Sequence, residues 1–210
     1  MLLWINGPFG GGKTQTAHEI QRRLPGSVIC DPEFPGFGLR RMLPPELRGD
    51  FQDLAAWRQG VVEVLDLALS QHEGVVIVPM TVTDSGYFAE TVGRLRELGH
   101  DVQHFTLLAR RETVVKRLRE RGLGQVVRLF AGKKATKGRE TWAVRQLDRC
   151  LERLGEPEFA EHLWTDDSTV PKTADRIAVL AGLKLRPNHE GRVRTRLRQV
   201  RVGVRHIRFD

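Results

Sequence analysis

The chain has 210 residues, of which 40% are hydrophobic and 29% are charged, and its net charge is +8. This length suits one domain with a full hydrophobic core, and the composition excludes a disordered or membrane-embedded chain. Residues 184–210 contain nine Lys or Arg and two acids, so they account for seven of the eight net positive charges. The charge of residues 1–183 therefore gives no reason to expect nucleic-acid binding.

Predicted strands and helices alternate along the chain. Strands are predicted at residues 2–6, 27–30, 74–82, 102–109 and 162–165, and helices at residues 13–24, 51–71, 86–98, 111–121, 141–154 and 172–182. This order predicts an α/β fold with a five-stranded parallel sheet and helices on both faces. We expect one domain over residues 1–183, with a mobile Gly- and Lys-rich connection at 122–140, and a basic C-terminal extension over 184–210.

The first strand leads into GPFGGGKT, residues 7–14, which fits the pattern G-x-x-x-x-G-K-[ST] between a strand and a helix. This pattern predicts a P-loop, and hence a P-loop NTPase that binds ATP or GTP with Mg²⁺. Lys13 is expected to reach the β- and γ-phosphates and Thr14 to bind Mg²⁺. The predicted nucleotide-binding residues are Gly7, Pro8, Phe9, Gly10, Gly11, Gly12, Lys13, Thr14 and Gln15.

Two acids follow the second strand, Asp31 and Glu33. A carboxylate at the carboxyl end of a parallel strand lies where such sheets bind ligands. Asp31 is thus predicted to bind Mg²⁺ or to accept a proton from an attacking hydroxyl, with Glu33 as the other candidate; the alternative is an Asp that caps a turn. The third strand ends in Pro79-Met80-Thr81 without an acid, which favours a small-molecule kinase over a motor or switch GTPase.

Several arginines are candidates for binding phosphate or acceptor. Arg117 and Arg121 lie one helical turn apart and lead into the connection, so they are predicted to belong to a basic lid over residues 117–149 that stabilises the transferred phosphate. The alternative is a helix surface with ordinary salt bridges. The predicted acceptor-binding arginines are Arg40, Arg58, Arg145 and Arg149.

The loop after the last strand, Thr165-Asp166-Asp167-Ser168, has two readings. Asp166 either borders the adenine of the nucleotide or belongs to an ordinary loop that caps the next helix. The sequence does not choose between them.

The chain resembles the tunicamycin-resistance protein family, whose fold is similar to that of adenylate, shikimate and chloramphenicol kinases. The stretches on which the resemblance rests span residues 2 to about 167: WINGPFGGGKTQTA, DPEFPGFGLR, WRQ, VIVPMT, HFTLLA, ETVVKRLRER, WAVRQLDRC and HLWTDD. Residues 122–140 look longer and more basic than in the family, and the extension is unusually rich in arginine.

The resemblance implies a nucleoside- or shikimate-kinase-like protein that binds ATP and protects against tunicamycin, a lipid-tailed uridine nucleoside antibiotic. Three hypotheses follow: phosphoryl transfer to a hydroxyl of the drug, ATP-dependent sequestration of the drug without chemistry, or a kinase acting on another nucleoside, sugar or antibiotic.

The basic extension is predicted to form a β-arm that packs on the domain or on a second subunit, with contact to an anionic membrane as the main alternative. We expect a cytoplasmic protein, because no leader precedes the first strand and no apolar run is long enough to span a bilayer. Cys30 and Cys150 show no metal-binding spacing and are expected to be reduced and buried.

Overall fold

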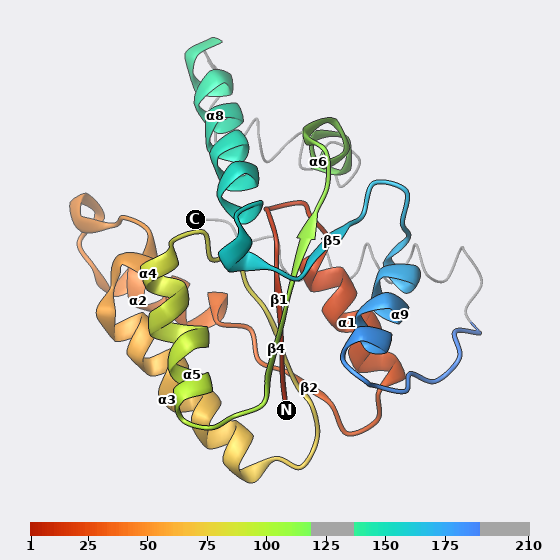
Figure 1. The fold of residues 1–210 in the computed structure, drawn as a ribbon. Helices are drawn as coiled ribbons and strands as arrows, with labels where there is room; N and C mark the ends of the chain where they lie inside the picture. Colours follow the sequence, from red (N-terminus) through yellow and green to blue (C-terminus); the bar gives the residue numbers. More distant parts are fainter. Residues whose placement is uncertain (119–136, 190–210) are drawn as a thin grey trace.

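The computed structural model describes residues 1–118 and 137–189, and in the second stretch it describes side chains from residue 146 onward. The sheet is parallel and five-stranded, as predicted, with the order β2-β3-β1-β4-β5. Its strands are β1 (Leu2–Asn6), β2 (Val28–Ile29), β3 (Val76–Pro79), β4 (Val102–Leu108) and β5 (His162–Trp164). Because β1 is the central strand, the loop that follows it begins in the middle of the sheet (Figure 1).

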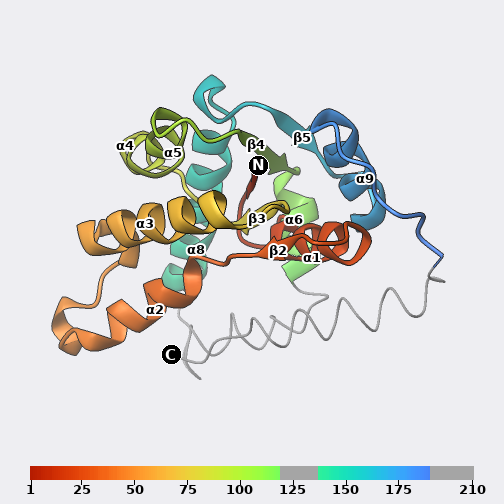
Figure 2. The same cartoon turned by 90° about the horizontal axis from the view of Figure 1, so that it is seen from below.

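Helices cover both faces of the sheet. Figure 2 shows α1 and α9 on one side, and α3 with the helical run α4–α5 on the other. In Figure 1, α6 and α8 lie beyond the carboxyl ends of the central strands. The α-helices are α1 (Lys13–Arg23), α2 (Glu33–Met42), α3 (Ala55–Gln71), α4 (Ser85–Phe88), α5 (Arg94–Glu97), α6 (Arg111–Leu118), α8 (Lys137–Leu154) and α9 (Val170–Leu180).

Shorter helical turns complete the fold. A π-helical segment, η3 (Ala89–Gly93), joins α4 to α5 without a break, and three 3-10 turns lie at η1 (Pro45–Leu47), η2 (Phe51–Asp53) and η5 (Pro157–Phe159).

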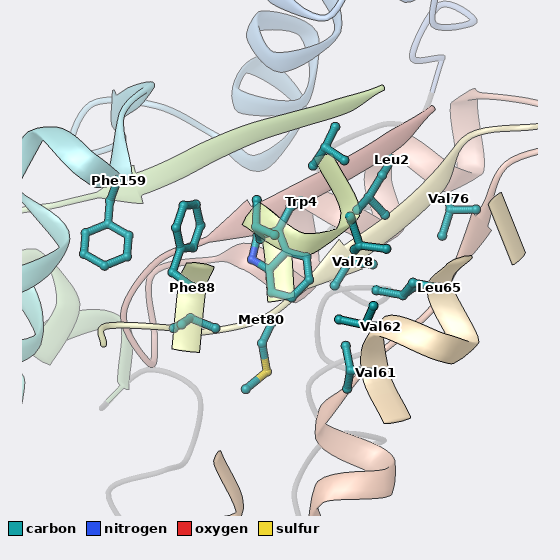
Figure 3. Close-up of a cluster of buried hydrophobic side chains, with 14 of the residues drawn as sticks. Leu2, Trp4, Val61, Val62, Leu65, Val76, Val78, Met80, Phe88 and Phe159 are labelled. Carbon is teal, nitrogen blue, oxygen red and sulfur yellow. The ribbon is translucent and has the colours of Figure 1, made fainter. Parts of the chain in front are cut away.

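Alternation along β1 divides the core in two. Leu3 and Ile5 face the cluster beneath α1 and α9, whereas Leu2 and Trp4 face the cluster beneath α3 and α4–α5. Figure 3 shows Trp4 in the second cluster together with Met80 and Phe88. The four apolar side chains of β1 thus pack in clusters on both faces of the sheet, as expected for the centre of a parallel sheet.

The structure corrects several predicted boundaries. Helix α2 was not predicted, because its sequence EFPGFGLRRM contains a proline and two glycines. The proline, Pro35, lies in the first turn, where its missing N–H has no partner within the helix and costs little. The third strand ends at Pro79 rather than residue 82, and the predicted helix 51–71 is divided at Leu54 into η2 and α3.

The predicted mobile connection at 122–140 was too long at its end, because α8 begins at Lys137. The rest of that prediction lies outside the described residues. No helix of the described part of the chain is both long and apolar enough to cross a membrane.

The start of the C-terminal extension packs on the domain. Leu185 lies against the core cluster beneath α1 and α9. The backbone N–H of Arg186 donates to Arg23 O at 2.8 Å, and Arg22 Nη2 donates to Asn188 Oδ1 at 2.8 Å. Contacts of the domain therefore continue past the predicted boundary at residue 183, while residues 190–210, with the predicted β-arm, lie outside the described residues.

Candidate functional site

The loop between β1 and α1 is compact and surrounds a buried lysine. The N–H of Gly11 donates to Pro8 O at 2.8 Å and closes a turn, and the N–H of Thr16 donates to Gly12 O at 2.9 Å, which begins the α-helical bonding. Lys13 is only 5% exposed, and its Nζ donates to Pro8 O at 3.3 Å. The ammonium group therefore lies beneath the loop and not in solvent.

Two glycines are required by the backbone of this loop. Gly7 has φ +149°, and a Cβ there would lie 2.8 Å from Leu107 O. Gly12 has φ +100° and is the N-cap of α1, so it offers no side chain to the first turn. N–H groups in the first turn of a helix have no acceptor within the helix, and together with the helix dipole they favour an anion. The loop, Lys13 and this helix start fit the phosphates of a nucleotide.

The other predicted loop residues differ in exposure. Pro8, Gly10, Gly11 and Gln15 are buried and Thr14 is half-buried, whereas Phe9 is 63% exposed. Thr14, in the first turn of α1, is the hydroxyl of this loop that can bind Mg²⁺ beside bound phosphates.

The acids after β2 lie at the carboxyl edge of the sheet, as predicted, and one of them closes the turn that leads into α2. Asp31 Oδ1 accepts a hydrogen bond from the N–H of Glu33 at 3.0 Å, and Glu33 begins α2. The capping role considered as the alternative is thus present. Trp57 in α3 fixes the same turn, because its buried Nε1 donates to Pro32 O at 2.8 Å. Nothing in the sequence apart from the tryptophan itself indicates this contact.

The loop after β5 is bonded to α6. Asp166 Oδ1 accepts from the N–H of Arg110 at 2.9 Å and from Thr113 Oγ1 at 2.6 Å. Burial raises the pKa of Asp166, but these hydrogen bonds and the nearby Arg110 and Arg117 outweigh it and hold the pKa below its usual value. Arg117 donates to both Thr165 Oγ1 and Thr165 O. Asp166 and Arg117 thus join two elements at the carboxyl edge of the sheet.

The predicted acceptor-binding arginines are dispersed. Arg40 Nε donates to Gly49 O at 3.2 Å on the outer side of α2. Arg58 is in α3 and reaches toward η3, where its Nε pairs with Glu90 Oε2 at 2.6 Å; its guanidinium lies 4.3 Å from the centre of the Tyr87 ring.

Of the arginines predicted on the lid, Arg149 is exposed on α8. Arg121 and the side chain of Arg145 lie outside the described residues.

The C-terminal half of α8 lies near the P-loop. Burial raises the pKa of Cys150 in α8 to about 11, and the nearby positive charge of Lys13 opposes that rise. Two residues before Cys150, Asp148 of α8 pairs with Arg111 of α6 at 3.0 Å. Both cysteines are free thiols, but each is half-buried and not buried as predicted. Burial also raises the pKa of Cys30, directly after β2.

The parallel sheet, the glycine loop after its central strand and the buried Lys13 define the class of protein: a P-loop NTPase with a kinase-like fold. The family model AAA_33, described as an AAA domain, matches residues 2–137. The structure of the Deinococcus radiodurans tunicamycin resistance protein is 30% identical, with a TM-score of 0.70 over 89% of this chain and 99% of that one. The chain belongs to the AAA_33 family of AAA domains and to the tunicamycin-resistance protein family.

More distant structures share the fold. The shikimate kinase of Bacteroides thetaiotaomicron is 16% identical, with a TM-score of 0.57 over 87% of this chain and 99% of that one. The Mycobacterium tuberculosis APS kinase, solved in complex with AMPPNP and APS, is 17% identical, with a TM-score of 0.56 over 86% and 96%. No curated protein sequence matches the chain significantly.

Proposed function

We propose that the protein confers tunicamycin resistance in the cytoplasm by transferring the γ-phosphoryl group of ATP to a hydroxyl of the drug. The observation that supports this most is the P-loop with Lys13 buried beneath it, at the same edge of the sheet as Asp31. Family membership supports tunicamycin as the acceptor, because the D. radiodurans relative is a tunicamycin resistance protein.

In this proposal the residues of the loop bind the nucleotide. Bound Mg-ATP would supply the phosphoryl group and a cation that offsets its developing charge. N–H groups of the loop and of the first turn of α1, together with the ammonium of Lys13, hold the phosphates, and the Thr14 hydroxyl and the Asp31 carboxylate hold Mg²⁺. Arg117 and Arg121 stabilise the transferred phosphate, with the lid over residues 117–149, and Asp166 lies beside the base.

The acceptor is activated by a carboxylate. The drug hydroxyl forms a bond to the γ-phosphorus while the bond to the β,γ-bridging oxygen breaks and ADP leaves. The hydroxyl proton passes to Asp31, or to Glu33 in the alternative assignment, and then to water. Arg40, Arg58, Arg145 and Arg149 are proposed to bind the uridine or sugar. Phosphorylation would add negative charge to the drug.

The test is mass spectrometry of tunicamycin incubated with the purified protein and Mg-ATP, beside a Lys13→Ala variant shown by circular dichroism to be folded. We expect a product heavier by one phosphoryl group, absent from the variant. Unmodified drug retained only with ATP would replace phosphoryl transfer by sequestration. Drug neither modified nor retained would contradict tunicamycin as the ligand and direct the search to another nucleoside, sugar or antibiotic.

A further inference from the structure

The last residue of β1, Asn6, joins the P-loop to the segment after β3. Its side chain is fully buried. Asn6 Oδ1 accepts from the N–H of Gly7 at 2.8 Å and from the N–H of Val82 at 3.0 Å, and Nδ2 donates to Val82 O at 2.9 Å. Three of the hydrogen-bonding positions of one amide are therefore used, and each reaches a backbone group.

This amide replaces backbone pairing where the sheet ends. The register of β1 with β3 runs to the pair Ile5 and Pro79, and the N–H of Met80 still donates to Ile5 O at 3.1 Å. Beyond that point the Asn6 amide bonds both the N–H and the C=O of Val82, as a peptide group of a neighbouring strand would. A carboxylate of the same shape could not donate to Val82 O, and an alkyl group could make none of these bonds.

A second side chain forms a hydrogen bond with the carbonyl group of the same glycine. Thr81 Oγ1 donates to Gly7 O at 2.8 Å. The N–H of Gly7 is thus held by Asn6, and its C=O by Thr81. Glycine can adopt many backbone conformations, and Gly7 has φ +149°. Its hydrogen bonds with Asn6 and Thr81 hold it in this conformation and so set the direction in which the loop leaves the sheet.

The segment after β3 is fixed from other directions as well. Asp84 caps α4 by accepting from the N–H of Tyr87 at 2.9 Å, and Arg153 of α8 donates to Thr83 O at 3.3 Å. Residues 81–84 therefore connect the first glycine of the P-loop to α4 and α8. Beyond the end of β3, where the sequence has no acid, Thr81 and the amide of Asn6 make these hydrogen bonds instead.

We propose that Asn6 and Thr81 are positioning residues for nucleotide binding, which orient the peptide groups of Gly7 and so the N–H groups of the P-loop. Neither residue needs to contact the nucleotide. The inference rests on the proposed function only in that this loop binds ATP, so its test measures nucleotide affinity and not drug modification.

The experiment titrates the full chain with a fluorescent ATP analogue and Mg²⁺, and measures thermal unfolding of each variant. Asn6→Asp keeps size and acceptors but loses the bond to Val82 O, and Thr81→Val is a neutral change that loses the bond to Gly7 O. We expect each to raise Kd about tenfold. Thr81→Ser, which keeps the hydroxyl, should restore Kd to within about twofold of the natural protein.

A matched control separates positioning from general loss of stability. Thr91→Val removes a buried hydroxyl that bonds Tyr87 O at 2.7 Å, in η3 and not in the loop. It should lower the unfolding temperature and leave Kd unchanged. The double variant of Asn6→Asp with Thr81→Val should raise Kd by less than the product of the two single effects, because both act on one glycine.

Each outcome is decisive. Variants of Asn6 and Thr81 that lose stability but keep Kd, as Thr91→Val does, would overturn the inference and leave the proposed function intact. If Kd rises in the variants but the natural protein forms no phosphorylated drug, the inference is upheld and the proposed phosphotransferase activity is contradicted. A natural protein that binds no nucleotide would overturn both.

Discussion

Arg117 in α6 and Thr165 after β5 form a double hydrogen bond, in which the guanidinium donates to the threonine hydroxyl at 3.0 Å and to its carbonyl. The hydroxyl also donates to Leu108 O at 3.0 Å, so it links α6 to the end of β4. Thr165→Val keeps the shape and removes the hydroxyl. We expect the free energy of unfolding to fall by about 1–2 kcal/mol, measured by urea denaturation.

The control for this change is Thr165→Ser, which keeps the hydroxyl and should lose clearly less stability than Thr165→Val. Equal stability of Thr165→Val and the natural protein would show that the hydroxyl contributes nothing to the link between α6 and β4.

The two roles of Asp31 can be separated by two substitutions. The amide oxygen of Asn can accept the same hydrogen bond from the N–H of Glu33, so Asp31→Asn should change the free energy of unfolding by less than about 0.5 kcal/mol, whereas Asp31→Ala should cost about 1 kcal/mol. Both should abolish phosphoryl transfer if the carboxylate holds Mg²⁺ or accepts the proton. Turnover and drug binding are measured separately, because Asp31→Asn should leave drug binding largely intact.

An Asp31→Asn variant with full turnover, or a strain carrying it with full resistance, would restrict Asp31 to the capping bond with Glu33. The carboxylate would then have to come from another residue, and Glu33→Gln is the next variant to measure.

Arg58 has contacts that predict a structural contribution besides any contact with substrate. Its Nε pairs with Glu90, its Nη1 donates to Gln52 O, and its guanidinium lies on the Tyr87 ring. Arg58→Met keeps much of the aliphatic length and removes the charge. We expect it to cost about 1–2 kcal/mol of unfolding free energy, mostly from the unsatisfied carbonyl and the lost ring contact, because Glu90 is about half exposed.

The matched variant is Glu90→Gln, which leaves Arg58 charged and available. If Arg58 acts on the acceptor only by holding α3 against η3, both variants should raise the KM for the drug in proportion to their loss of stability. A rise in KM confined to Arg58→Met would instead indicate direct binding of the acceptor.

The buried His104 predicts a pH dependence of stability. Burial lowers its pKa from 6.5 to about 4, reinforced by the nearby Arg96 and His162, although a hydrogen bond to Ala160 O opposes the shift. Between these two pKa values the unfolded chain binds more protons than the folded one. The free energy of unfolding should therefore fall as the pH drops from about 7 to 4, by about 3 kcal/mol from this residue.

The control is His104→Gln, which can still donate to Ala160 O but does not titrate. The slope of unfolding free energy against pH, from urea denaturation at a series of pH values, should be smaller for this variant than for the natural protein. Parallel slopes would assign the acid sensitivity to other groups.

The parallel sheet and its P-loop were predictable because each rests on a local pattern. A run such as LLWIN, followed by glycines and Lys13-Thr14, contains both the strand and the helix start within a few residues. Helix α2 was not predictable in this way, since its sequence contains Pro35 and two glycines and its apolar side chains pack against residues distant in sequence.

The candidate site was predictable in its residue types but not in its connections. Lys13 and Asp31 follow from spacing and from their position after strands. Asn6 was not predicted to be a site residue, because nothing in the sequence shows that its amide bonds Val82, 76 residues away. Arg58 was predicted to bind the acceptor, but a sequence does not show that its charge also pairs with Glu90 in the fold.

The packing of residues 184–188 on α1 determines where the basic tail can be removed. Arg23 is 5% exposed, and its Nε donates to Arg186 O at 2.7 Å. A deletion that begins at residue 184 would therefore remove one acceptor of the buried Arg23 guanidinium and uncover the apolar surface under Leu185. Any loss of vesicle binding could then reflect damaged folding. A deletion that begins at residue 190 keeps Arg186 and Asn188 and their hydrogen bonds to α1. It therefore tests the effect of residues 190–210 alone.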